Sequence, residues 1–395
     1  MSVIEGRIEI DLYPARSKGQ RVQLSSSRPV HAARVLIGKT PQQALDIIPL
    51  LFSICGTAQS RAAHRAICQA LGSAADATAA EERARDMLVQ VETGKEHMLR
   101  LFLDWPKLFY LDNNNDELPW LSRLVAHFRD ALFENGCAFS LDSRLQVQHD
   151  SLQQLIAELN DYLERHVFGM APGRWLNETS DIHSLHQWAT HSDSITARSI
   201  AVICDKGWAS QGVTDCDLLP ELSTAELQQL FKGDTSEQLI AAPRWQGKCH
   251  ETSPLARQFR QPLIQALHHE FDNTLITRWL ARLVELAIIP QQLQHGAAQL
   301  AASEAVTDDT PPRQADGLAQ VEAARGRLIH RVQIDADHIS HYQVLAPTEW
   351  NFHPEGLVTQ ALDSIASGDS NGLGTLGHIL INAIDPCVGY ELRIH

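Results

Sequence analysis

The sequence lacks any hydrophobic stretch long enough to cross a membrane, since a spanning helix needs about 20 consecutive apolar residues. It also lacks an export signal, because residues 1–7 contain neither an apolar core nor a pair of arginines. These two absences predict a cytoplasmic protein without a membrane span.

Positive charge is scarce as well. The chain has 33 Lys and Arg against 48 Asp and Glu, a formal net charge of −15, and its basic residues form no run. Nucleic-acid binding needs a basic surface that meets the phosphates. The composition therefore argues against nucleic acid as a partner.

Cysteine pairs typical of structural zinc sites are missing, because no two of the seven cysteines share a CxxC spacing. An odd number at scattered positions predicts reduced thiols in the cytoplasm and not a disulfide framework. His183, His186 and His191 could place two imidazoles on one helical face, but ordinary surface histidines are the more frequent outcome. Glycine-rich phosphate loops are absent too, so nucleotide chemistry has no support.

Apolar periodicity predicts an α+β protein dominated by helices. Residues 7–12 and 21–24 alternate as two strands of a hairpin. Helical spacing follows at residues 41–52, 84–104, 120–133, 152–167, 224–231 and 258–286. Gly56 is expected to end the first of these helices and Pro106 the second. A short strand is predicted at 200–203, and another helix from Pro290 to residue 300.

The whole chain, 1–395, is predicted to form a single unit. Its parts are N-terminal strands (1–40), a helical core (41–300), a polar linker or loop (303–317) and a C-terminal part (318–395). That last part contains a hairpin of strands 326–334 and 339–345, then helices 357–365 and 376–383. It ends in a turn that carries a cysteine.

Two cysteine stretches, at opposite ends of the chain, are the candidate site. Residues 53–56 read SICG and residues 385–387 read DPC. Pro386 biases Asp385 towards an extended backbone, so Cys387 is expected on a turn. For Cys55 or Cys387 taken singly, a buried structural thiol is the more frequent role.

Both stretches resemble the cysteine motifs of nickel-iron hydrogenase large subunits. In that family an Arg-x-Cys-Gly-x-Cys motif lies near the N-terminus and an Asp-Pro-Cys-x-x-Cys motif near the C-terminus. Five further stretches resemble the family in the same order: residues 4–6, 38–41, 251–257, 322–326 and 342–351. The resemblance implies a hydrogenase large-subunit-like fold, with a core of long helices and small peripheral antiparallel sheets.

The departures from that pattern concern the metal. In the family each motif supplies one terminal nickel thiolate and one thiolate that bridges nickel to iron. Here Ala58 and Tyr390 stand at the bridging positions, and Ala33 replaces a proton-transfer glutamate. A nickel site of four soft thiolates cannot form from two. We therefore expect neither nickel nor hydrogenase activity.

The resemblance also implies a pocket for iron with its cyanide and carbon monoxide ligands. Arg325 and Thr348 match the groups that bind the cyanides, which accept charge-assisted hydrogen bonds. The apolar niche for carbon monoxide matches Leu328, Ala346 and Pro347. Without this context, Arg325 would be expected to pair with Glu322, and Thr348 to cap the local backbone.

The chain is thus similar to the HupK/HoxV-type hydrogenase maturation proteins, which are degenerate relatives of the large subunit. The resemblance implies a scaffold that holds or transfers an Fe(CN)₂CO group on Cys55 and Cys387. It also implies a HypC/HupF-type chaperone and the hydrogenase large subunit as partners. The retained cysteines match nickel positions, so a partner's cysteine could complete the iron site. The alternative is a metal-free mimic of the large subunit that only binds such chaperones.

Overall fold

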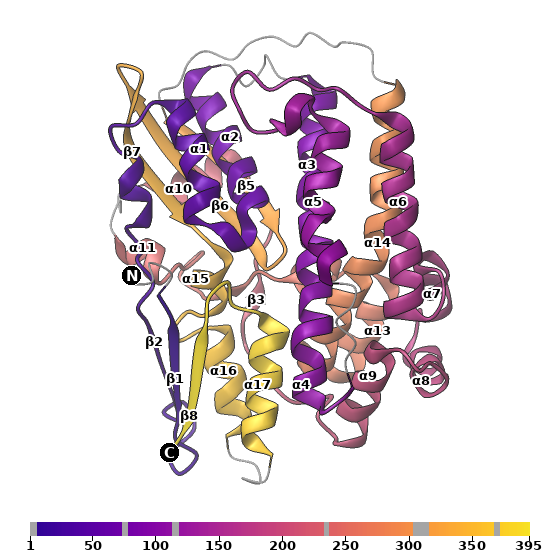
Figure 1. Cartoon of the computed structure of the whole chain (residues 1–395). Coiled ribbons are helices and arrows are strands. Elements are labelled where there is room, and N and C mark those ends of the chain that lie inside the picture. The colour runs from indigo at the N-terminus through magenta and orange to yellow at the C-terminus, as the bar shows by residue number, and fades with distance from the viewer. Residues whose placement is uncertain (1–5, 73–77, 113–117, 233–236, 303–315, 367–371) are drawn as a thin grey trace.

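The computed structural model describes residues 6–72, 78–112, 118–232, 237–302, 316–366 and 372–395. Long helices stand side by side on one side of the molecule, and a three-stranded sheet covered by helices α1 (Pro41–Leu51) and α2 (Gly56–Leu71) lies on the other (Figure 1). A second sheet, with helices α16 and α17 beside it, lies below. Helices dominate, as the apolar periodicity predicted.

Four helices form the bundle: α3 (Ala79–Leu99), α5 (Leu118–Leu132), α6 (His149–Leu163) and α14 (Leu275–Ala302). Helix α3 packs on α5 and α14, and α6 packs on α5 and α14. Their apolar stripes meet in one large core, since each helix has hydrophobic residues on the face towards its neighbours. Buried examples are Leu88, Phe128, Leu159 and Leu283.

The three-stranded sheet is antiparallel, in the order β5 (Asp316–Ala323), β6 (Gly326–Asp335) and β7 (His338–Leu345). The predicted hairpin is β6 and β7. Strand β5 was missed, because its first two residues were assigned to the polar linker 303–317. Residues 303–315 of that linker lie outside the described residues.

Both ends of the chain meet in the second sheet. Strands β1 (Ile8–Leu12) and β2 (Val22–Ser26) form the predicted antiparallel hairpin, and β8 (Tyr390–Ile394) pairs with β1 in parallel. Figure 1 shows β1 and β8 running side by side. Of the N-terminal stretch 4–6, only Gly6 is described. The parallel pair β3 (Asp217–Leu218) and β4 (His250–Glu251) is short.

The prediction that Gly56 ends a helix is wrong. Helix α1 (Pro41–Leu51) ends earlier, a 3-10 turn covers Ser53–Cys55, and Gly56 begins α2 (Gly56–Leu71). The cause lies outside the local sequence: the Glu92 carboxylate, from α3, accepts the first N–H groups of α2 and so starts a new helix there.

Two further predictions failed where tertiary packing outweighed local signals. Residues 200–203 are not a strand, because they lie in α9 (Ile195–Asp205), whose first turn is capped by the Ser194 side chain. Pro106 does not end a helix, because it lies in the first turn of α4 (Trp105–Phe109), where its missing N–H has no helical partner to lose. A π-helical turn, Arg100–Asp104, joins α3 to α4.

The single helix predicted at 258–286 is also wrong. Three helices share that stretch: α12 (Pro254–Gln258), α13 (Pro262–Phe271) and α14. Gln261 before Pro262 is extended, and Asp272 has φ of 62°, so the backbone turns at both places. Pro290 starts no new helix but lies inside α14.

The remaining elements follow the predicted helical stretches or fill the loops between them. Helix α8 (Ile182–His191) carries the three histidines, all exposed. No group of three or more His, Cys, Asp or Glu side chains suited to a metal occurs among the described residues. The other helices are α7 (Pro172–Glu178), α10 (Thr224–Leu230), α11 (Glu237–Ala241), α15 (Pro347–Asn351), α16 (Leu357–Ile365) and α17 (Leu373–Ile384).

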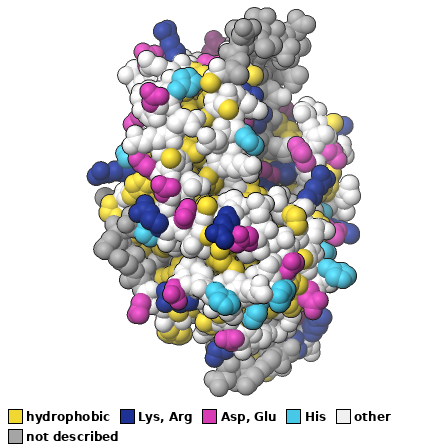
Figure 2. Space-filling view, turned by 90° about the vertical axis from the view of Figure 1, so that its right-hand side faces the viewer, with side chains coloured by type: hydrophobic (Ala, Val, Ile, Leu, Met, Phe, Trp, Pro, Cys, Tyr) yellow, Lys and Arg dark blue, Asp and Glu magenta, His cyan; other side chains and the backbone are white. Residues whose placement is uncertain are grey.

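Surface charge is mixed on the face shown in Figure 2, where basic and acidic side chains are interspersed and no continuous basic patch appears. None of the helices in the described part of the chain combines the length and the apolar character needed to cross a bilayer.

Candidate functional site

The structure brings Cys55 and Cys387 together. Cys55 ends the 3-10 turn before α2, and Cys387 lies in the turn between α17 and β8. Both are free thiols, buried to 7% and 9% exposure, and their side chains share a hydrogen bond. One site is therefore built from both ends of the chain.

Asp385 shapes the turn that presents Cys387. Its backbone is not extended, as Pro386 had suggested, but has φ of 63°, because Asp385 is the C-cap of α17 and its N–H donates to the Ile381 carbonyl. Its buried carboxylate lies 2.8 Å from Arg100 Nε and 3.2 Å from Arg325 Nε. These two arginines hold the pKa of Asp385 below its usual range despite burial, which by itself raises it.

Arg325 lies in the turn between β5 and β6 and is almost fully buried. Besides Asp385 it binds Glu96, at 3.2 Å, and not Glu322, so the expected pairing with Glu322 is wrong. Glu322 pairs with Arg327 instead. The Arg325 Nη1 atom is buried and has no hydrogen-bond partner among the described residues.

Thr348 contacts the cysteine turn directly. Its Oγ1 accepts a hydrogen bond of 3.3 Å from the backbone N–H of Cys387. Thr348 is buried in the first turn of α15, which the structure places against that turn. The side chain therefore links two segments instead of only capping its own helix.

Leu328 and Ala346 belong to one small apolar cluster, which also contains Ala58 at the second position of the first cysteine motif. Pro347 is buried next to Ala346 and begins α15. The methyl group of Ala58, in the first turn of α2, thus lies in a hydrocarbon environment, close in the chain to Cys55.

The two thiols differ in acidity. The hydrogen bond with Cys55, aided by the charge of Arg325, lowers the pKa of Cys387 to about 6 in spite of burial. The same hydrogen bond and burial raise the pKa of Cys55. The contact between the two thiols therefore makes one of them, Cys387, more acidic than an ordinary cysteine.

A cavity of about 90 Å³ lies against the two cysteines. One water molecule needs roughly 10–15 Å³ of such space, so several small ligand atoms fit. Ala33 and Ala346 line it, and so do two charged residues that the sequence analysis missed, Arg28 and Glu349. Four of the predicted site residues do not line it: Arg325, Leu328, Pro347 and Thr348.

Tyr390, at the second position of the C-terminal motif, faces another space. Its hydroxyl lies 3.0 Å from His378 Nδ1, and it lines a second cavity, of about 370 Å³, together with Asp385 and Arg100. Cys387 lines this cavity as well as the smaller one. Burial raises the pKa of Tyr390 to about 12. Its oxygen is therefore a neutral hydroxyl and not a replacement for a thiolate.

Glu92 is a positioning residue that the sequence analysis missed. Its carboxylate accepts the N–H groups of Thr57 at 2.7 Å and Ala58 at 2.9 Å, which fixes the start of α2 directly after Cys55. The only sequence signal is an acidic residue inside the apolar stripe of α3.

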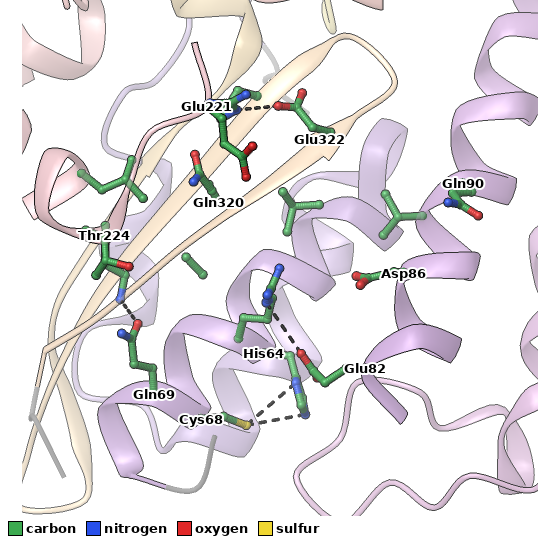
Figure 3. A pocket seen from close by; sticks show the side chains of 17 residues that line it. His64, Cys68, Gln69, Glu82, Asp86, Gln90, Glu221, Thr224, Gln320 and Glu322 are labelled. Carbon is green, nitrogen blue, oxygen red and sulfur yellow. Dashed lines mark hydrogen bonds and ion pairs between the residues drawn. The ribbon is translucent and has the colours of Figure 1, made fainter. Parts of the chain in front are cut away.

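A larger cavity, about 820 Å³, lies elsewhere, between α2, α3 and the free edge of β5. Figure 3 shows polar side chains around it, among them His64 and Cys68 of α2, Glu82 and Gln90 of α3, and Gln320 of β5. None of the predicted site residues lines this cavity, so size alone does not identify the site.

Comparison with known proteins shows to which family this chain belongs. A family model described as nickel-dependent hydrogenase matches residues 189–361. The hydrogenase expression/formation protein HoxV of Cupriavidus necator is 31% identical over 95% of this chain and 93% of its own length. The chain belongs to the HoxV/HupK family of hydrogenase expression/formation proteins. HupK of Azotobacter vinelandii is 29% identical over 98% of both chains.

The names of these HoxV/HupK relatives support a role in hydrogenase maturation. The fold is that of hydrogenase large subunits, as predicted. The [NiFeSe] hydrogenase of D. vulgaris Hildenborough is similar with a TM-score of 0.66 and 16% identity, covering 93% of this chain and 92% of that one. An NAD⁺-reducing [NiFe]-hydrogenase has a TM-score of 0.62, 16% identity and the same coverage.

Proposed function

We propose that this HoxV/HupK-family protein is a maturation scaffold, which holds or transfers an Fe(CN)₂CO group before its insertion into the hydrogenase large subunit. The iron group is cargo here and not a resident cofactor. The observation that carries the proposal is the buried pair of Cys55 and Cys387, beside an arginine with an unpartnered nitrogen.

The donor set fits such a cargo. Thiolates are soft ligands that suit iron. The Arg325 Nη1 atom, buried and unpartnered within the described part of the chain, can donate a charge-assisted hydrogen bond to a cyanide nitrogen. The apolar cluster of Leu328 and Ala346 suits carbon monoxide, which accepts almost no hydrogen bonds.

Loading and release both follow from having only two thiols. A thiol must lose its proton before it binds metal; the pKa of Cys387 is lowered, whereas that of Cys55 is raised. Two sulfur ligands hold the cargo less firmly than four, which favours transfer. In this proposal a partner's cysteine supplies a further ligand to the iron.

Hydrogenase activity is not part of this proposal, because Ala58 and Tyr390 supply no sulfur and nickel is not expected. The partners we propose are a HypC/HupF-type chaperone and the hydrogenase large subunit as acceptor. The alternative is a metal-free mimic that binds those proteins; it would require neither Cys55 nor Cys387.

An infrared spectrum tests the proposal. The protein is purified without oxygen from cells that express the maturation machinery, and bands are sought in the carbon monoxide and cyanide stretching region. We expect bands in the wild type that vanish in Cys55→Ala and Cys387→Ala and persist in the control Cys204→Ala, which changes an exposed thiol. Iron-free protein that still binds its partners would support the metal-free mimic instead.

A further inference from the structure

The cysteine cavity contains a charged pair to which the hydrogenase resemblance gives no role. Arg28, which follows β2, forms an ion pair with Glu349 of α15, and both residues line the cavity next to Cys387. The side chains are only 16% and 10% exposed. The pair thus joins the N-terminal hairpin to the helix that carries Thr348.

The hydrogen-bonding groups of this ion pair are not all satisfied within the described residues. Burying two charges is costly unless their remaining hydrogen-bonding groups are satisfied. Yet the Glu349 Oε2 atom is buried without a hydrogen-bond partner among the described residues. Burial raises the pKa of Glu349, although Arg28 opposes this. Because that free oxygen carries negative charge, it opposes an anion in the cavity, and Arg28, which lines the same cavity, is the group there that attracts one.

We propose that Arg28 is a second anion-recognition group of the site, which binds the negative end of the ligand in this cavity, and that Glu349 holds its guanidinium in place. A guanidinium has five N–H donors in a planar fork, so it can bind one carboxylate oxygen and still donate to a second acceptor. Arg28 binds the ligand directly without a bond to the metal, and Glu349 is the positioning residue.

Arg28 complements Arg325 by its location. Arg325 reaches the cysteine turn from the β5–β6 turn and is anchored by Asp385 and Glu96, whereas Arg28 comes from the N-terminal hairpin and lines the cavity itself. Of the two cations, only Arg28 lines the cavity. For the identity of the ligand this inference rests on the proposed function; for recognition of an anion it does not.

Thiocyanate is the probe, because it is a small linear anion with a terminal nitrogen. Its binding to the iron-free protein is measured by isothermal titration calorimetry. Glu349→Gln removes the competing charge, so thiocyanate should bind about tenfold more tightly than to the wild type. The double variant Arg28→Gln/Glu349→Gln leaves no unpaired buried charge, which protects the fold, and should bind about tenfold more weakly than the wild type.

The matched control is Arg174→Gln/Glu178→Gln, which removes an exposed ion pair and should leave the affinity unchanged. Opposite shifts in the two test variants are specific to anion recognition. Equal affinities in wild type, Glu349→Gln and the double variant would overturn the proposal, and so would a wild type and Glu349→Gln that bind no thiocyanate.

An infrared measurement separates this inference from the proposed function. In protein loaded with the iron group, the double variant should keep its bands but shift the cyanide stretching frequencies, whereas unshifted frequencies would contradict a role for Arg28 towards that cargo. Absence of bands from the wild type would contradict the proposed cargo, while the thiocyanate titration would still decide whether Arg28 recognises an anion.

Discussion

At the scale of single residues, the acidity of Cys387 depends on a neighbour that is remote in the chain. The hydrogen bond from Cys55 is the largest influence that lowers the pKa of Cys387 to about 6. Neither cysteine motif reveals this by itself. The sequence identified both thiols through a family resemblance, but their contact is a property of the fold.

Alkylation of the iron-free protein tests this coupling. In the wild type, the rate at which iodoacetamide modifies Cys387 should rise with pH around a midpoint near 6, because the thiolate is the reactive form. In Cys55→Ala the midpoint should move to higher pH, since the stabilising hydrogen bond is gone. Mass spectrometry of the modified peptide gives the rate, and an unchanged midpoint would contradict the shared hydrogen bond.

Arg325 has a structural role that a second experiment measures. Arg325→Ala removes the cation between two buried carboxylates, Asp385 and Glu96, so we expect a loss of about 3–5 kcal/mol in the free energy of unfolding. Urea denaturation measures the loss. Arg174→Ala, at an exposed ion pair, should cost far less, because solvent screens such a pair. Similar costs for the two variants would show that Arg325 does not balance those charges.

At the scale of elements, the C-terminal strand positions the site. Strand β8 pairs with β1 over five residue pairs, and the turn that carries Cys387 lies directly before it. The sequence predicted the strands of β1 and β2 from their alternation, but it gave no sign of β8. Pairing in parallel with a strand from the other end of the chain leaves no local pattern.

Deleting residues 390–395 should therefore loosen the cysteine turn. The deletion removes the β8 ladder, whose net hydrogen bonds contribute about 1 kcal/mol each, so we expect a loss of about 3 kcal/mol or more in unfolding free energy. It should also speed the alkylation of Cys387. Arg393→Gln, which keeps the strand backbone, is the control, and equal alkylation rates in deletion and control would argue against anchoring by β8.

Helix boundaries, too, depend on contacts that the local sequence does not reveal. The stretch 118–132 folds as its apolar stripe predicts, because that stripe faces one continuous core. The similar pattern at 258–286 is instead divided where Asp272 takes a positive φ. A glutamate from another helix, Glu92, decides that α2 begins at Gly56. Such contacts join residues that no window of sequence contains.

At the scale of the whole molecule, buried histidines couple stability to pH. Burial lowers the pKa of His330 to about 3, and burial together with Arg85 and Arg61 lowers that of His64 to about 3. In the unfolded chain a histidine takes up a proton below about pH 6.5. The folded state does not do so until about pH 3, so stability is full above pH 6.5 and falls as the pH decreases towards 3.

The free energy of unfolding should thus fall between pH 6.5 and pH 4 by up to about 1.4 kcal/mol per pH unit for each of the two histidines. Urea denaturation at several pH values measures this slope. His330→Gln should reduce the slope, and the exposed His183→Gln should not. A slope that His330→Gln leaves unchanged would mean that His330 is protonated in the folded protein.

The sequence by itself determined what depends on composition, periodicity and motif order. These features gave the helix-dominated α+β class, most of the helices and the two hairpins, and the ordered motifs pointed to the family and to both cysteines. They suffice because an apolar stripe must be buried wherever it lies, and because motif order survives substitutions elsewhere.

Only the tertiary structure decided how the site is assembled. It placed Cys55 against Cys387, turned Arg325 towards Asp385 and Glu96, and brought Arg28 and Glu349 into the wall of the cavity. These arrangements depend on charges and hydrogen bonds between segments that lie hundreds of residues apart. Which residues pair with one another depends on how the segments pack, and the local sequence does not contain that information.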